Sequence, residues 1–353
     1  MKQPLLSFFA VLGMAFTSAA MANPVCYEAN PENAKGKHIV FIASDHEYRG
    51  EETLPAMARI LAKRHGFDCT VLFGLDENGE VKAGESNIPG LEALEKADLM
   101  VLFTRFQALP DEQMKYIDAY LNRGGPVMGL RTSTHGFKYG NKESAYSKYD
   151  FQSKVEGYEK GFGHQVLGQT WVGHYGKNHQ QSTRITIIPD KAGHPILTGV
   201  KDIHVQCGGY NAEAADDWNI LTMAQPLMSM EFDGEPDATK PPMASEWTRE
   251  YTGANGTKGR VFTSLYGASE DILNPGYRRM LINATYWLLG LEDSIKADAP
   301  IDFVGPYQPN TFRGGGYARG VKPEMYKGFE SPVPANNNTG TPKAKGKPKP
   351  KKG

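Results

Sequence analysis

Short apolar runs alternate with stretches of helical periodicity over the first third of the chain. Residues 38–43, 68–73 and 97–103 are mostly apolar, which is typical of strands that are covered on both faces of a parallel sheet. Between the first two runs, apolar residues recur every three or four positions from 54 to 62. Gly66 follows this stretch as a helix-ending residue, so the pattern predicts strand, helix, strand in succession.

A second helix is predicted to open at Pro110-Asp111-Glu112 and to end at Gly124-Gly125, before a further apolar run at 126–130. This alternation predicts an α/β fold with a parallel, doubly wound sheet. Beyond residue 160 the pattern changes and indicates added β elements, several of them antiparallel, before one closing helix. The predicted strands are 183–189, 204–207, 218–223, 243–247 and 260–266, and the helix is 277–289.

The run that ends at Leu130 has the form of a nucleophile elbow. Its last residues, Gly129 and Leu130, turn directly into the polar segment Arg131-Thr132-Ser133-Thr134-His135, as in turns that present a nucleophile at the tip of a strand. The residue at the tip is Arg131, whose guanidinium cannot attack a substrate. Ser133 lies two residues past the tip and does not match a serine hydrolase. The chain therefore has the frame of an elbow enzyme without its nucleophile.

Polar side chains follow three predicted strands at their carboxyl ends. Ligands of open α/β sheets bind beyond these ends, so the three loops should meet over one crevice. We predict His135 or Glu47 as a catalytic base, with Arg131 and Arg105 stabilising a developing oxyanion. The residues predicted to bind substrate are Asp45, His46, Tyr48, Thr132, Ser133 and His174. In the alternative interpretation, the arginines and carboxylates only pair with one another to satisfy buried charge.

Histidines in these loops raise the question of a metal. His174 and His179 lie in a Gly-rich segment that could fold over the crevice. A divalent metal such as zinc, held by some of His46, His135, His174 and His179, is one interpretation, and solvent-facing histidines are the other. The spacings do not match a zinc pattern on a single helix. The cofactor therefore stays open, with zinc as the candidate.

The N-terminal segment has the features of a secretory signal peptide. Lys2 precedes an apolar stretch at 5–16 that is too short to cross a bilayer, and Ala20-Met21-Ala22 matches a cleavage site. We expect cleavage after Ala22 and a periplasmic or secreted protein without a transmembrane segment. The expected divisions are a signal peptide at 1–22, a lead-in at 23–36, one domain at 37–292, an extended C-terminal arm at 293–329 and a disordered Lys/Pro-rich tail at 330–353.

Charge and motifs narrow the class of partner. The whole chain carries a formal charge of −1, and because Lys2 and six lysines of the tail supply seven positive charges, the remainder carries −8. An acidic body argues against a nucleic-acid partner, and no phosphate-binding glycine motif follows the first strand. Three cysteines remain after cleavage, an odd number that leaves at least one free thiol. The oligomeric state stays open, a homo-oligomer included.

Several short motifs in the middle of the chain occur together in one known family. They are Asp45-His46-Glu47 after the first strand, Gly129-Leu130-Arg131, Gly173-His174, His194-Pro195-Ile196 with Gly199, and Gly259-Arg260-Val261-Phe262 leading to Trp287. With them, residues 37 to 290 resemble the ThuA-like (trehalose utilisation) proteins, a branch of the class I glutamine amidotransferase-like fold. The resemblance implies a flavodoxin-like sheet and a role in carbohydrate metabolism. It implies no amidotransferase activity, because the family lacks that catalytic cysteine.

From the resemblance and the loop residues we expect an exported enzyme that acts on an oxidised (keto) sugar or glycoside. It would abstract a proton next to the carbonyl, with Tyr48, Phe106 and Trp171 stacking on sugar faces. The alternative is a non-catalytic carbohydrate-binding or scaffold domain. Arg131 and Ala268 favour this alternative, since many relatives carry a titratable histidine at both positions. A third interpretation is an envelope-associated protein positioned by its Lys-rich tail.

Overall fold

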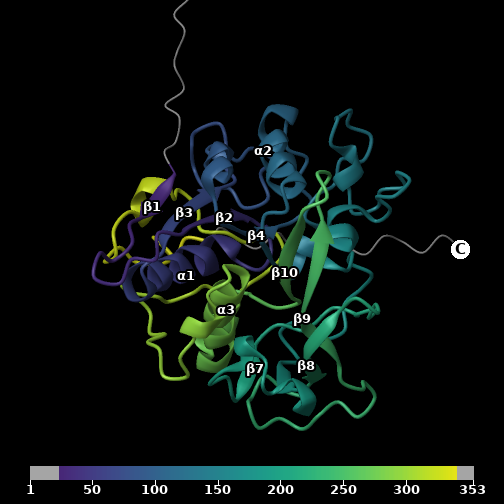
Figure 1. Ribbon diagram of the computed structural model, residues 1–353. Helices are drawn as coiled ribbons and strands as arrows, with labels where there is room; N and C mark the ends of the chain where they lie inside the picture. Colours follow the sequence, from purple (N-terminus) through teal and green to yellow (C-terminus); the bar gives the residue numbers. More distant parts are fainter. Residues whose placement is uncertain (1–23, 340–353) are drawn as a thin grey trace, which may run out of the picture.

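The protein is built on one mixed sheet of ten strands, which crosses the middle of the molecule (Figure 1). We describe it from a computed structural model, which places residues 24–339. The strands lie in the order β1-β3-β2-β4-β5-β10-β9-β8-β6-β7. The expected signal peptide and the end of the Lys-rich tail fall at 1–23 and 340–353, outside the described residues.

The middle of the sheet is parallel and has flavodoxin-like topology. Its strands, in spatial order, are β3 (Asp68–Phe73), β2 (His38–Ser44), β4 (Leu99–Thr104), β5 (Val127–Leu130) and β10 (Lys258–Ser264). Counted along the chain, these five strands have the order 2-1-3-4-5, which is the flavodoxin-like arrangement. The predicted α/β class and doubly wound sheet are confirmed. The order reverses between β2 and β4, where folds of this kind bind their ligands.

Helices cover both faces of the parallel strands. One face packs against α1 (Gly50–His65) and α3 (Pro275–Leu288), and the other against α2 (Asp111–Asn122) and the short helix η1 (Leu91–Lys96). Alternate residues of β2 point to opposite faces of the sheet. Phe41 belongs to the hydrophobic core under α1 and α3, and Ile42 to the core under α2 and η1. This two-sided burial explains why the strands of the first half are nearly continuous apolar runs.

The second half of the sheet is antiparallel, as the sequence predicts. Its strands are β9 (Met243–Thr252), β8 (Asn219–Pro226), β6 (Thr183–Ile187) and β7 (Ile203–Val205). β9 extends five residues beyond the predicted end at 247. The polar pair Arg249-Glu250 hides this extension in the sequence, although Tyr251 after it is buried and pairs with Gly259 of β10.

Short helical turns connect these elements. They are η2 (Arg131–His135), η3 (Ser147–Tyr149), η4 (Gly163–Leu167), η5 (Pro189–Lys191), η6 (Pro195–Leu197), η7 (Asp271–Leu273), η8 (Glu292–Ser294) and η9 (Pro323–Tyr326). Between residues 24 and 339, no helix is both long and apolar enough to cross a bilayer. Cys26, Cys69 and Cys207 are all free thiols, and only Cys26 is exposed.

Both ends of the described chain differ from the expected divisions. Within the expected lead-in, β1 (Val25–Tyr27) pairs antiparallel with β3, and a strand of three residues is too short to leave a periodic pattern. Past the expected start of the tail at 330, the chain remains packed. Val333 is buried and pairs with Tyr307 in a short bridge. The ordered arm therefore extends beyond the expected boundary, at least to residue 339.

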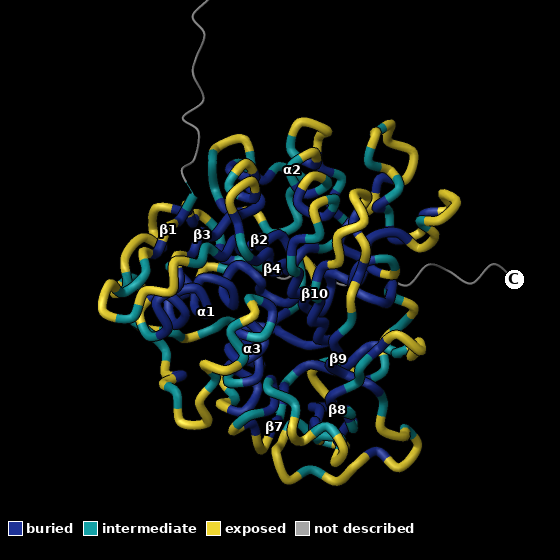
Figure 2. Tube along the Cα trace, viewed as in Figure 1, coloured by how far each residue is buried: buried dark blue, intermediate teal, exposed yellow. Residues whose placement is uncertain are grey.

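The C-terminal arm covers the outer side of α1, which explains why almost every residue of that helix is buried (Figures 1 and 2). Arg59 of α1 donates hydrogen bonds to the carbonyl oxygens of Tyr326 and Ser331, at 3.0 and 2.5 Å. A helix on the face of such a sheet ordinarily leaves one side in water. Here the arm replaces water on that side, and polar residues of α1 find their partners in it.

His65, at the end of α1, makes stability dependent on pH. Its Nε2 lies 2.9 Å from the carbonyl oxygen of Pro300 and its Nδ1 lies 3.1 Å from the hydroxyl of Tyr286. Burial lowers the pKa of His65 to about 4. The unfolded imidazole binds a proton near pH 6.5, so the stabilising contribution is complete above that pH and is lost as the pH falls towards 4. We expect His65→Gln to remove about 2 kcal/mol of the destabilisation that acid causes at pH 5.

Urea unfolding at pH 7.5 and pH 5 measures this effect. The unfolding free energy of the wild type should fall more steeply between the two pH values than that of His65→Gln. Equal falls in both proteins would contradict the assignment.

Candidate functional site

The elbow predicted from the sequence is present at the end of β5. Arg131 has φ +42°, in the left-handed region that residues with a Cβ rarely adopt, and begins the η2 turn. Two residues earlier, a Cβ on Gly129 would lie 2.5 Å from the side chain of Leu167, so a larger residue there would force that side chain to move. The strained turn places the polar segment 131–135 at the carboxyl edge of the parallel strands.

Arg131 is fully buried beneath this edge. Its Nη1 donates to the carbonyl oxygens of Gly208 and Leu265, at 2.8 and 2.9 Å. Its Cζ lies 3.7 Å from the ring centroid of Tyr48 and 4.5 Å from that of Tyr210. Among residues 24–339 it forms no ion pair with a carboxylate. Two aromatic faces and two carbonyl dipoles therefore stabilise this buried cation.

The loops after β2 and β4 meet in an ion-pair cluster. Arg105 Nη1 lies 2.7 Å from Glu47 Oε2 and 3.0 Å from His46 Nε2. A guanidinium only donates, so His46 Nε2 accepts, and its proton lies on Nδ1. Burial lowers the pKa of His46, and the charge of Arg105 lowers it further. His46 is thus a neutral imidazole whose Nε2 is already occupied.

Asp45 links the first loop to the elbow. Its carboxylate accepts the backbone N–H groups of Glu47 and Tyr48 and the hydroxyl of Thr132, which lies 3.1 Å away. Burial raises the pKa of this carboxyl, while the hydrogen bond from Tyr48 opposes the rise. The carboxylate of Asp45 is therefore fully hydrogen-bonded by Thr132 and by backbone N–H groups. These bonds hold the loop after β2 against the elbow.

His135 is a buried, neutral imidazole at the end of the elbow turn. Its Nδ1 lies 3.2 Å from Thr134 Oγ1, and the hydroxyl of Thr134 donates its only proton to the carbonyl oxygen of Arg131, at 3.1 Å. With the hydroxyl proton of Thr134 on the carbonyl oxygen of Arg131, we assign the ring proton of His135 to Nδ1, which leaves the lone pair on Nε2. Burial lowers the pKa of His135 well below its usual value, and the charges of Arg105 and Arg131 act in the same direction. The imidazole is neutral at physiological pH.

Aromatic rings enclose His135 and extend to the surface. The ring centroids of Phe106, Trp171 and Tyr210 lie 5.0, 5.4 and 5.7 Å from that of His135. His174 is exposed and packs on Tyr210 at 5.4 Å, and burial lowers its pKa. Since Phe106 and Trp171 are partly exposed, they form an aromatic rim beside a buried imidazole. Such rims suit the apolar faces of sugar rings.

Not every predicted residue joins this arrangement. Ser133 donates to the carbonyl oxygen of Leu102 at 2.8 Å and is buried inside the turn. His179 stacks on Phe312 at 4.4 Å. Within residues 24–339, no group of three or more His, Cys, Asp or Glu side chains is arranged to hold a metal ion. The four histidines considered as metal ligands are therefore not gathered into a metal centre in the described chain.

Two residues of the site escape sequence analysis. Tyr210, which packs on both Arg131 and His135, follows Gly208-Gly209 in a loop without periodicity. Phe312 lies in the arm, about 180 residues from the elbow along the chain, and packs on Tyr48 at 5.1 Å. The glycine pair next to a tyrosine was the only local signal for the first, and no local signal marks the second.

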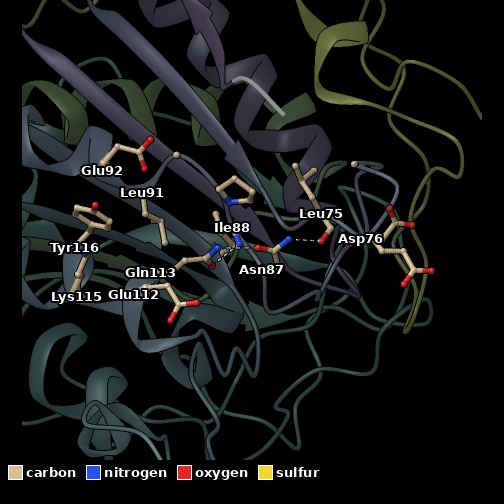
Figure 3. A pocket seen from close by; sticks show the side chains of 14 residues that line it. Leu75, Asp76, Asn87, Ile88, Leu91, Glu92, Glu112, Gln113, Lys115 and Tyr116 are labelled. Atoms are coloured by element: carbon tan, nitrogen blue, oxygen red, sulfur yellow. Dashed lines mark hydrogen bonds between the residues drawn. The ribbon is translucent and has the colours of Figure 1, made fainter. Parts of the chain in front are cut away.

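A separate cavity of about 540 Å³ lies beside the start of α2, and Figure 3 shows the side chains that line it. Leu75, Ile88 and Leu91 form its apolar floor, and Gln113 is held there by the backbone N–H of Ile88, at 2.8 Å. No residue predicted for the site lines this cavity. We place the candidate site at the carboxyl edge of β2, β4 and β5, because histidines with lowered pKa values and converging polar groups gather there.

Comparison with known families gives this site its context. The family model of ThuA, described as trehalose utilisation, matches residues 37–288, and the chain belongs to this family. A ThuA-like protein from Parabacteroides merdae ATCC 43184 is 14% identical, with 83% of this chain and 99% of that chain covered and a TM-score of 0.42. A ThuA-like protein from Bacteroides uniformis ATCC 8492 is 12% identical, with 77% of this chain and 98% of that chain covered and a TM-score of 0.45. Among curated proteins, none matches the chain.

The ion-pair cluster predicts a coupled change in histidine pKa values. Arg105→Met removes the charge that lowers the pKa of His46 and of His135, and it leaves Glu47 unpaired beside His46. We expect the pKa of His46 to rise, and that of His135 to rise as well. NMR titration of the imidazole Hε1 signals measures both.

A matched control is Arg260→Met, which breaks an Arg–Glu pair with Glu292, 3.2 Å apart, outside the crevice. This control variant should leave the pKa values of His46 and His135 unchanged. An unchanged pKa of His46 in Arg105→Met would show that the cluster does not set its protonation.

Proposed function

We propose that the protein is a carbohydrate-active enzyme that abstracts a proton next to the carbonyl of a keto sugar or keto glycoside. The observation that carries the proposal is His135, a buried neutral imidazole with its lone pair on Nε2, close to two guanidinium charges. Membership of the trehalose-utilisation family supports a carbohydrate as substrate. The aromatic rim of Phe106 and Trp171 supports a sugar ring as the group that packs there.

In the proposed reaction, Nε2 of His135 takes the proton from the carbon beside the carbonyl. The C–H electron pair forms a C=C bond and the carbonyl oxygen becomes an enolate. Arg105 stabilises the enolate by direct contact, while Arg131, buried below, contributes only its field. The enolate then either expels the oxygen substituent on the next carbon, which leaves as an alcohol with the proton from His135, or regains that proton on carbon. The first outcome is a lyase reaction and the second an isomerase reaction.

The low basicity of His135 is matched by these positive charges. The same guanidinium groups that lower the pKa of His135 also stabilise the enolate. They therefore lower the pKa of the substrate C–H group together with that of the base. The Trp171 ring packs beside the imidazole, with the two ring centroids 5.4 Å apart. Because His135 is buried, the proposal includes a rotation of the Trp171 side chain, within an ordered loop, when substrate enters.

Product formation on 3-keto-glucosides tests the proposal. His135→Gln should lower kcat by at least about 100-fold, because it removes the base. Binding should persist, because glutamine places a polar side chain of similar size where the imidazole was. His164→Gln, at an exposed position of η4, is the control and should keep full activity. Full activity in His135→Gln would exclude His135 as the base.

The pH profile provides an independent prediction. An ordinary histidine base loses activity as pH falls through 6.5, but the depressed pKa of His135 keeps its base form populated below that value. We expect kcat to remain constant from pH 8 to below pH 6.5 and to fall only at more acidic pH. A loss of half the activity at pH 6.5 would indicate a solvated base instead.

A second candidate is a carbohydrate-binding domain without catalysis. The observation that favours it is that both carboxylates of the crevice are already engaged, Asp45 by backbone N–H groups and Glu47 by Arg105. If the wild type binds a sugar but forms no product from any keto or ordinary sugar tested, this candidate would be established.

Export is part of the proposal. Lys2, the short apolar stretch and Ala20-Met21-Ala22 support removal of a signal peptide and a periplasmic or secreted location. N-terminal sequencing of the protein recovered outside the cytoplasm should begin at Asn23. A start at Met1 would exclude cleavage.

A further inference from the structure

The C-terminal arm, which lies beyond the family match at 37–288, reaches the candidate site. The backbone N–H of Arg313 donates to the carbonyl oxygen of Glu47 at 2.8 Å, and that of Gly315 donates to the carbonyl oxygen of His46 at 2.6 Å. These are the residues of the β2–α1 loop that form the ion-pair cluster with Arg105. The arm therefore binds the backbone of the loop whose side chains form one wall of the crevice.

Further contacts fix this part of the arm on α1. The carboxylate of Glu52 accepts both the backbone N–H and the side-chain amide of Asn310, at 2.8 and 2.9 Å. The carbonyl oxygen of Thr311 accepts from Arg49 at 3.3 Å. In the arm, Asn310 and Thr311 come just before Phe312, and Arg313 and Gly315 come just after it. The backbone around Phe312 is thus tied down on both sides.

Phe312 joins two loops that otherwise lie far apart in the sequence. Its ring is buried, with Tyr48 of the first loop at 5.1 Å and His179 of the 171–181 loop stacked on it at 4.4 Å. A second link runs beside the stack, since Asn178 donates to the hydroxyl of Tyr48 at 2.9 Å. Tyr48 in turn lies against the guanidinium of Arg131. One aromatic stack thus connects the arm, both loops and the elbow.

We propose that Phe312 is a positioning residue that holds the 45–49 loop and the 171–181 loop in register, so that the crevice is ordered before a ligand arrives. The first loop carries His46 and Glu47, and the second carries Trp171 and His174. A ligand that meets two ordered loops does not have to bear the entropic cost of ordering them. The role in ligand binding rests on the proposed function, whereas the coupling of the loops does not.

Hydrogen exchange on the full mature chain tests the coupling without any ligand. In Phe312→Ala we expect amide exchange to accelerate at least tenfold in both 45–49 and 171–181, while β2, β4 and β10 keep their protection. The matched control is Phe303→Ala, because Phe303 stacks on Tyr307 with the same 4.4 Å separation and 24° tilt, elsewhere in the arm. The control should change exchange only around its own position.

Phe312→Leu extends the test if the alanine variant does not fold. It keeps apolar volume but offers no flat ring to Tyr48 and His179, so the same two loops should exchange faster, by about threefold. Acceleration in only one loop, or spread evenly over the whole domain, would overturn the positioning role and leave Phe312 as an ordinary core residue.

Binding of methyl 3-keto-glucoside to the same variants separates this inference from the proposed function. We expect at least tenfold weaker binding in Phe312→Ala and wild-type binding in Phe303→Ala. Coupled exchange with no binding in any variant, the wild type included, would count against the proposed function and still support the coupling. Wild-type affinity in a Phe312→Ala protein whose loops exchange faster would overturn the role of Phe312 in preparing the crevice.

Discussion

The buried guanidinium of Arg131 is the interaction on which the geometry of the crevice depends. It lies where an elbow enzyme holds its nucleophile, in a left-handed conformation, and bonds to carbonyl groups of two other segments. Those bonds join the elbow to Gly208 and to Leu265, just past the end of β10. The two tyrosine rings on its faces come from the β2–α1 loop and the loop after β7. One side chain thus draws four segments of the chain together.

A buried cation without a carboxylate also determines the electrostatics above it. Burial already disfavours charge on an imidazole, and a nearby guanidinium disfavours it further. This is why His135 and His174 have lowered pKa values on the same side of the sheet. The elbow carries a fixed positive charge at the position where elbow enzymes hold a nucleophile. Such a charge stabilises negative charge that develops on an oxygen atom during a reaction.

Local sequence patterns were sufficient for the parallel half of the fold and for the elbow. Runs such as 97–103 are apolar because both faces of β4 are covered, and Gly129 lets the side chain of Leu167 pack closely against β5. The loops after β2, β4 and β5 converge because parallel strands share an edge, so the meeting of Arg105 with His46 follows from topology. The site residues Tyr210 and Phe312 could not be predicted, since their contacts arise from long-range packing that leaves no period. The same holds for His179, whose place against Phe312 depends on an arm far along the chain.

The central claim is that this member of the ThuA family binds a sugar at the carboxyl edge of β2, β4 and β5, and not in the cavity beside α2. A crystal structure with methyl 3-keto-glucoside, obtained with the inactive His135→Gln variant, tests it most directly. We expect a sugar ring between Trp171 and the Arg105–Glu47 pair, with the carbonyl oxygen towards Arg105. A sugar bound beside Ile88 and Tyr116, or an empty crevice at saturating sugar, would contradict it.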